Sequence, residues 1–100
     1  MQVAKVGAGE AISGGRARRV TVTAGSAVRV DASDEGYLRL LIRNVGGAQV
    51  QLGFSPAEAQ ASGMPLDSGE TMSFQFAKPL ELWAYAINAD AELAVMEASI

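Results

Sequence analysis

The sequence predicts an all-β fold, an antiparallel β-sandwich or jelly roll of about seven to eight strands with an extended N-terminal arm. Apolar and polar residues alternate with a period of two along most of the chain, which is typical of half-buried strands. Clusters of Gly, Asn, Asp and Pro interrupt this alternation about every 8 to 12 residues, a spacing that favours a sandwich or small barrel. The 100 residues suit one domain.

The first segment of the chain predicts the arm. Residues 1–15 read MQVAKVGAGEAISGG, in which Gly and Ala are frequent and Val3, Val6 and Ile12 alternate only weakly. This composition is typical of an extended segment that does not fold on its own. We therefore expect an arm over residues 1–15 and a β-sandwich domain over residues 16–100.

Four strands are expected next, arranged as two hairpins. The segments 18–24 and 27–32 alternate in polarity and are joined by an Ala-Gly-Ser turn. The segments 37–44 and 48–54 alternate in the same way around an Asn-Val-Gly-Gly turn and form the clearest hairpin signal in the chain. One face of the third strand is mixed in chemistry and suited to meet a neighbouring molecule: Tyr37, Arg39, Leu41 and Arg43.

The segment SPAEAQASG breaks the alternation. Ser55 can cap a helix that begins at Pro56, Glu58 can complete a capping box, and Gly63 can end the helix. An isolated helix of this length is marginal, so one or two helical turns are weighed here against an irregular loop.

Three further strands are expected at 70–77, 80–87 and 91–98. The segment LELWAYAI is apolar on both faces, so this strand should be covered on both sides, by the arm, a loop or a second subunit. Trp83 and Tyr85 then lie in the core or in a subunit interface. A carbohydrate-binding platform is the alternative for these two aromatic residues.

The alternation also predicts the core and, indirectly, self-association. The residues expected in the core are Val20, Val22, Val28, Val30, Leu38, Leu40, Ile42, Val50, Leu52, Phe74, Leu82, Leu93 and Val95. With 49% hydrophobic residues, the chain carries more apolar surface than seven short strands can hide, so we expect a homo-oligomer, a dimer or trimer.

A short basic cluster comes just before the first strong strand, at Arg16, Arg18 and Arg19. One interpretation is solubilising charge that discourages the strand edge from pairing. The other is a docking contact for an acidic partner surface. Together with Trp83 and Tyr85, these arginines are the candidate protein-interface residues.

The composition argues against catalysis and against a metal. The chain has no histidine and no cysteine, which are the commonest general base, metal ligands and thiol nucleophile. Acidic residues cluster near two turns, and we interpret them as solvated turn residues in preference to calcium ligands: Asp31, Asp34, Glu35, Asp67 and Glu70. We expect no enzymatic activity, no catalytic residue, no cofactor and no bound metal.

Charge and hydropathy exclude two further classes of partner. A net charge of −3 disfavours nucleic acid, which binds to basic surfaces. No stretch of about 18 consecutive apolar residues occurs, and the first residues lack the apolar core of a signal peptide, so we expect no membrane partner and a soluble product.

Several motifs resemble a recurring pattern in small structural proteins of tailed bacteriophages. They are Arg43-Asn44 at the end of an apolar strand, Leu52-Gly53-Phe54, the rim from Gly63 to Glu70, and the PLELWA segment from Pro79 to Ala84. The resemblance covers roughly residues 37–86 and does not extend to the N-terminal third.

The resemblance implies a head decoration or cement protein, which is a β-sandwich that sits on the outer surface of the capsid and reinforces it. The implied partners are the lattice of the major capsid protein and copies of the chain itself. The implied location is the virion, after synthesis in the host cytoplasm. Another virion role, such as a tail or fibre-associated subunit, and a small carbohydrate-binding β-sandwich module remain as alternatives.

Overall fold

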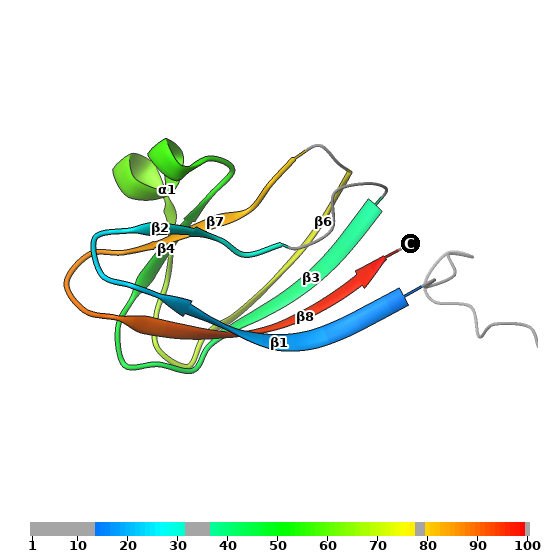
Figure 1. Cartoon of the computed structure of the whole chain (residues 1–100), viewed down its shortest axis with the longest axis horizontal. Helices are drawn as coiled ribbons and strands as arrows, with labels where there is room; N and C mark the ends of the chain where they lie inside the picture. The colour runs from blue at the N-terminus through cyan, green and yellow to red at the C-terminus, as the bar shows by residue number, and fades with distance from the viewer. Residues whose placement is uncertain (1–13, 32–36, 78–79, 100) are drawn as a thin grey trace, which may run out of the picture.

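Eight strands and one short helix make up the computed structural model, which describes residues 14–31, 37–77 and 80–99 (Figure 1). The elements are β1 (Gly14–Val22), β2 (Ala27–Arg29), β3 (Tyr37–Asn44), β4 (Val50–Gly53), α1 (Pro56–Ser62), β5 (Met64–Leu66), β6 (Thr71–Ala77), β7 (Trp83–Ala86) and β8 (Ala91–Ser99). The expected arm falls outside the described residues up to position 13, whereas Gly14 and Gly15 already belong to β1 and pair with Ser99 and Ala98.

The strands form two four-stranded sheets that face each other. One, called the long sheet here, has the order β1-β8-β3-β6, and the other, called the short sheet, has the order β2-β7-β4-β5. All named strand pairs are antiparallel. The long sheet extends beyond the short one at one end of the molecule (Figure 1). This arrangement is a jelly roll, so the all-β sandwich expected from the sequence is confirmed.

Both predicted hairpins are wrong. β1 pairs with β8 and β2 pairs with β7, so the first two strands lie in opposite sheets. β3 and β4 are likewise separated, because β3 pairs with β6 and β8 while β4 pairs with β5 and β7. Alternation in the sequence fixes which face of a strand is buried, but each short link carries the chain across to the other sheet instead of back along the same one.

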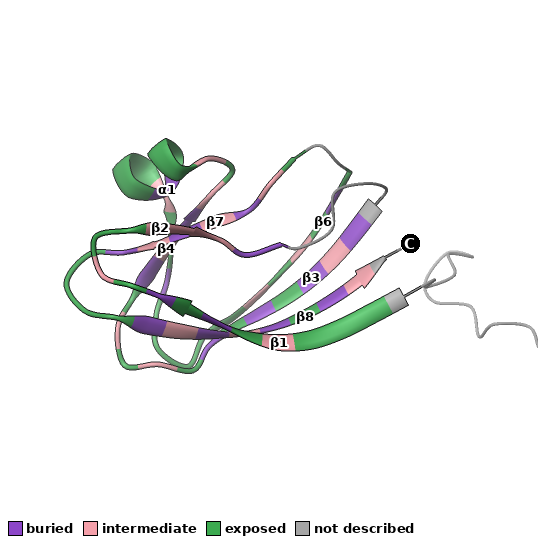
Figure 2. Cartoon of the chain, in the orientation of Figure 1, coloured by how far each residue is buried: buried purple, intermediate pink, exposed green. Residues whose placement is uncertain are grey.

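The core lies between the two sheets, and the buried residues that form it are coloured purple in Figure 2. Of the residues expected there, Val28 and Phe74 are only partly buried and pack against the core from its margin, and the others are buried. The predicted core omitted Phe76, which is buried in β6, and Leu66, which lies in β5. That strand has three residues and includes Pro65, so its pattern was too short to identify.

Helix α1 covers the outer face of the short sheet (Figure 1). Ser55 caps the helix, since its Oγ accepts a hydrogen bond from Glu58 N at 3.1 Å, and Glu58 Oε1 accepts one from Phe54 N at 3.0 Å. A Cβ on Gly53 would lie 2.6 Å from the backbone nitrogen of Ala59, so the helix approaches the sheet closely at a residue without a side chain. The helix explains why β7 is apolar on both faces.

Asn44 connects three parts of the chain at the end of the long sheet. It is fully buried, and its Nδ2 donates to Ala48 O at 2.7 Å and to Leu66 O at 3.0 Å. Its Oδ1 accepts from Gly46 N at 3.1 Å, and its backbone carbonyl accepts from Gly69 N at 2.7 Å. The Arg-Asn motif and the rim from Gly63 to Glu70 therefore have a structural role in this fold.

Candidate interaction surface

The outer face of the long sheet carries an apolar row in its centre. The strand register aligns Ala17 of β1, Met96 of β8 and Leu41 of β3 side by side. Leu41 lies between the buried residues Leu40 and Ile42, so it points outward, and its aligned neighbours Ala17 and Met96 share that face. Met96 is 60% exposed and Leu41 is 44% exposed, although both are large hydrophobic residues. We call the face around this row the Met96 surface.

Arginines flank the row on both sides. Arg19 and Arg43 lie in the neighbouring row with Ala94 between them, and Arg39 lies in the row on the other side, next to Ala98. Arg19 pairs with Glu92 at 2.9 Å, and Arg39 donates to Gln75 Oε1 at 3.2 Å. The outward strand positions of this sheet thus carry three arginines against one carboxylate, in a chain whose net charge is −3.

The Met96 surface has relief. Met96 and Leu41 stand above small neighbours and border two shallow grooves, one on each side of the row. Among the residues lining the first groove are Arg19, Arg43, Thr71 and Ala94. Among those lining the second are Gly15, Arg39 and Ala98. A partner surface can therefore place apolar groups in the grooves and acidic groups against the arginines.

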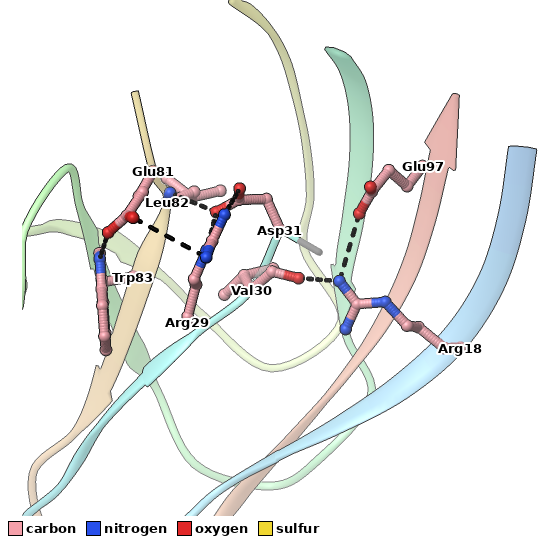
Figure 3. Close-up of polar contacts among 8 residues, drawn as sticks. All are labelled: Arg18, Arg29, Val30, Asp31, Glu81, Leu82, Trp83 and Glu97. Carbon is pink, nitrogen blue, oxygen red and sulfur yellow. Dashed lines mark hydrogen bonds and ion pairs between the residues drawn. The ribbon is translucent and has the colours of Figure 1, made fainter. Parts of the chain in front are cut away.

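The three arginines predicted as one cluster do not all point to the same side of the long sheet. They lie within β1, and alternation along the strand separates Arg19, on the outer face, from Arg18, which points between the sheets. Arg18 donates to the carbonyl oxygen of Val30 and lies 3.3 Å from Glu97, which is buried (Figure 3). Arg16 is exposed near the start of the strand. Arg18 and Arg16 each line the margin of one of the two grooves, whereas Arg19 projects from the outer face beside the row.

Trp83 and Tyr85 lie on the opposite side of the molecule, on the outer face of the short sheet. Both are half-buried, and helix α1 packs against their strand. The indole Nε1 of Trp83 donates to Glu81 Oε1 at 3.1 Å (Figure 3). The two aromatic residues thus belong to a covered layer and are not brought together with the arginines.

A polar network lies at the adjacent ends of β2 and β7, near these residues (Figure 3). Asp31 has a fully buried side chain, forms an ion pair with Arg29 at 3.0 Å and accepts a hydrogen bond from Leu82 N at 2.7 Å. Arg29 also lies 3.8 Å from Glu81. Because its carboxylate accepts from the backbone of Leu82 as well as from a guanidinium, Asp31 links the ends of β2 and β7.

The sequence pattern found part of the Met96 surface. The mixed face of β3 identified Arg39, Leu41 and Arg43, whereas Met96 was missed. Its signal was present, because the alternation that places Leu93 and Val95 in the core turns Met96 outward. The position of β8 between β1 and β3 could not be predicted from the sequence, because it depends on pairing between distant segments.

Two further searches concern metal and membrane. Across the described residues, no group of three or more acidic, histidine or cysteine side chains is placed to hold a metal ion. In the same part of the chain, no helix has both the length and the apolar character to cross a bilayer.

Comparison with known proteins identifies the fold and no family. No family model matches the chain, and no curated protein matches it. A de novo designed double-stranded β-helix is 22% identical over 82% of this chain and 97% of its own, with a TM-score of 0.57. A structure from work on Bacillus endospore appendages, described as disulfide-linked pili, is 14% identical over 85% of each chain, with a TM-score of 0.52. The chain shares its fold with these two structures, the first of which is described as a double-stranded β-helix.

Proposed function

We propose that this chain is a non-enzymatic structural protein that docks on a repeating protein surface through the Met96 surface. The observation that carries the proposal is the exposed pair Met96 and Leu41 between rows of arginines. Met and Arg are enriched in protein interfaces, where apolar residues form a desolvated centre and polar residues a rim. Ala17, Ala94 and Ala98 keep the rest of the face low enough for close approach.

The charge of the face defines its partner. Arginine binds carboxylates through two parallel hydrogen bonds, so the best partner is a protein surface with acidic groups around an apolar centre. A single contact through this one surface is weak. Many identical contacts on a lattice compensate, because the second and later contacts form at a high effective concentration.

The outer surface of a tailed-bacteriophage capsid is the lattice that we propose. Its support is the sequence resemblance of residues 37–86 to head decoration and cement proteins. The jelly roll is compatible with an assembly role, since the fold also occurs in a structure from work on pili, although the disulfide linkage described there requires cysteines that these 100 residues do not have. In this proposal the chain stabilises the head after it has assembled.

The arm has a smaller part in the proposal than the sequence suggested. An arm could reach along the shell or a neighbouring subunit, but residues 14 and 15 of the arm expected over residues 1–15 are paired with β8. Any reach along a neighbour is thereby limited to residues 1–13, which fall outside the described residues.

The carbohydrate-binding alternative is less favoured by the geometry. A sugar platform needs aromatic rings that are open to solvent, whereas Trp83 and Tyr85 are half-buried beside α1. A tail or fibre-associated role uses the same kind of surface as capsid decoration, and the two are separated by experiment.

The test is co-sedimentation of the purified chain with heads and, separately, with tails of the phage that carries the gene. We expect binding to heads that weakens at least about tenfold in the double variant Arg39→Gln, Arg43→Gln. The control is Ala57→Glu, Gln60→Glu, which changes the net charge equally on exposed positions of α1. Binding to tails alone would move the role to the tail, and binding to a glycan array but to neither particle would overturn the proposal.

A further inference from the structure

The free edge of the long sheet at β6 is unusual in its chemistry. The strand reads TMSFQFA and has no charged side chain and no proline over seven residues. Natural sheets protect such edges with charge, proline or short length, because an open edge offers backbone groups to another chain. The other three edge strands are protected: β1 carries three arginines, and β2 and β5 have three residues each.

The backbone of β6 presents its hydrogen-bonding groups outward at alternate residues. Asn44 N donates to Glu70 O at 3.0 Å, so the hydrogen-bonded pairs with β3 continue at Met72 and at Phe74. The residues between them, Thr71 and Ser73, direct their N–H and C=O groups away from β3. Within the described part of the chain, these groups of Thr71 and Ser73 have no hydrogen-bond partner.

Apolar side chains lie beside this edge. Met72 and Phe74 are only half-buried at the margin of the core, and with Met64 they line a cleft between β6 and the short sheet. Met64 is 59% exposed and Phe54, which also lines the cleft, is 46% exposed. A strand added to β6 would therefore gain apolar contacts in addition to backbone hydrogen bonds.

We propose that β6 pairs with β6 of a second copy, antiparallel and around a two-fold axis at Ser73. A second copy is the occupant because its own β6 supplies the same unpaired groups and no charge, so the two strands do not repel each other. Pairing between two β1 strands would instead bring two sets of arginines together. With Ser73 opposite Ser73 of the second copy, Met72 of each strand lies opposite Phe74 of the other, and the two long sheets become one continuous sheet.

The experiment measures self-association of the full chain by analytical ultracentrifugation. We expect a dimer, and we expect Ser73→Lys and Ser73→Glu each to weaken it about five-fold or more, because each places like charges opposite each other at the axis. An equimolar mixture of the two variants should associate more tightly than either variant alone. Rescue by opposite charge identifies contact between the two Ser73 positions, since damage to the fold would not be repaired by mixing.

Two controls complete the test. Thr21→Lys adds the same charge on the outer face of β1, at the other edge of the sheet, and should leave the dimer intact. Circular dichroism and thermal melting should show that the Ser73 variants remain folded. A wild-type chain that is monomeric at high micromolar concentration, a dimer that tolerates Ser73→Lys, or a mixture that fails to recover association would overturn the proposal. Loss of the dimer in Met96→Asp instead would transfer the contact to the Met96 surface and overturn it as well.

Discussion

Met96 of β8 lies directly opposite Leu41 of β3, and both side chains project from the outer face of the long sheet. Single exposed hydrophobic residues are common on proteins, but two that are cross-strand neighbours form a contiguous patch. The arginines on either side give that patch a charged rim. This pairing depends on residues that are 55 positions apart in the chain (96 − 41 = 55).

Met96→Asp should reduce binding to the partner surface at least about tenfold, because it places a charge in the desolvated centre of the contact. Its effect on the melting temperature should be small, since Met96 is 60% exposed. Co-sedimentation and thermal melting of the same preparations measure both quantities. The control is Ile87→Asp, which alters a residue of 50% exposure in the link between β7 and β8. Equal loss in the two variants would contradict a role for the Met96 surface.

Binding through the Met96 surface should weaken as salt concentration rises, because exposed charges are screened beyond about 8–10 Å at physiological ionic strength. Titrating sodium chloride in the co-sedimentation assay measures this slope. Arg43→Gln should make the slope shallower as well as lowering affinity at low salt. Salt-independent binding would show that the arginines do not contact acidic groups.

Asn44→Ala should lower the free energy of unfolding by about 3 kcal/mol, because it leaves the buried carbonyl of Leu66 and its neighbours without a donor. Urea denaturation followed by Trp83 fluorescence measures the change. Asn88→Ala, at an exposed position in a turn, is the matched control and should change stability by less than about 0.5 kcal/mol. Leaving a buried polar group without a hydrogen-bond partner costs at least about 1 kcal/mol. A smaller loss of stability in Asn44→Ala would contradict the prediction and would mean that water replaces the amide as the donor.

Gly53→Ala should displace helix α1, because the new Cβ would meet the backbone nitrogen of Ala59 at 2.6 Å. We expect destabilisation of about 1–3 kcal/mol and a red shift of Trp83 fluorescence as the helix moves away from β7. Gly47→Ala provides the comparison, since a Cβ there has no atom within 4 Å among the described residues. Unchanged fluorescence in Gly53→Ala would show that the helix tolerates the extra methyl group.

The faces of the strands could be predicted from the sequence, and their partners could not. Leu38, Leu40 and Ile42 are buried as their alternation indicates, because the period of two is a local property. The Asn-Val-Gly-Gly turn after β3 looks like a hairpin turn, yet Asn44 uses its side chain to bind Ala48 and Leu66 while the chain crosses to the other sheet. Such crossing depends on contacts between distant segments.

The candidate site shows the same division between local and distant information. Arg39, Leu41 and Arg43 share a face because they are two residues apart on one strand, and the sequence identified them together. Arg18 was expected to be a surface residue, but the alternation along β1 turns it to the inner side of the sheet, where it lies 3.3 Å from Glu97. Its role depends on a strand that lies at the other end of the chain.

The topology also determines when the chain can fold during synthesis. β1, β2 and β3 all pair with strands that the ribosome adds much later, since β1 and β2 pair with β8 and β7 and β3 pairs with β6 and β8. Contacts between distant segments slow folding to roughly milliseconds to seconds in all-β domains, while elongation proceeds at about 5–20 residues per second. The first three strands therefore remain unpaired for seconds, and the long sheet is completed only when β8 has been synthesised.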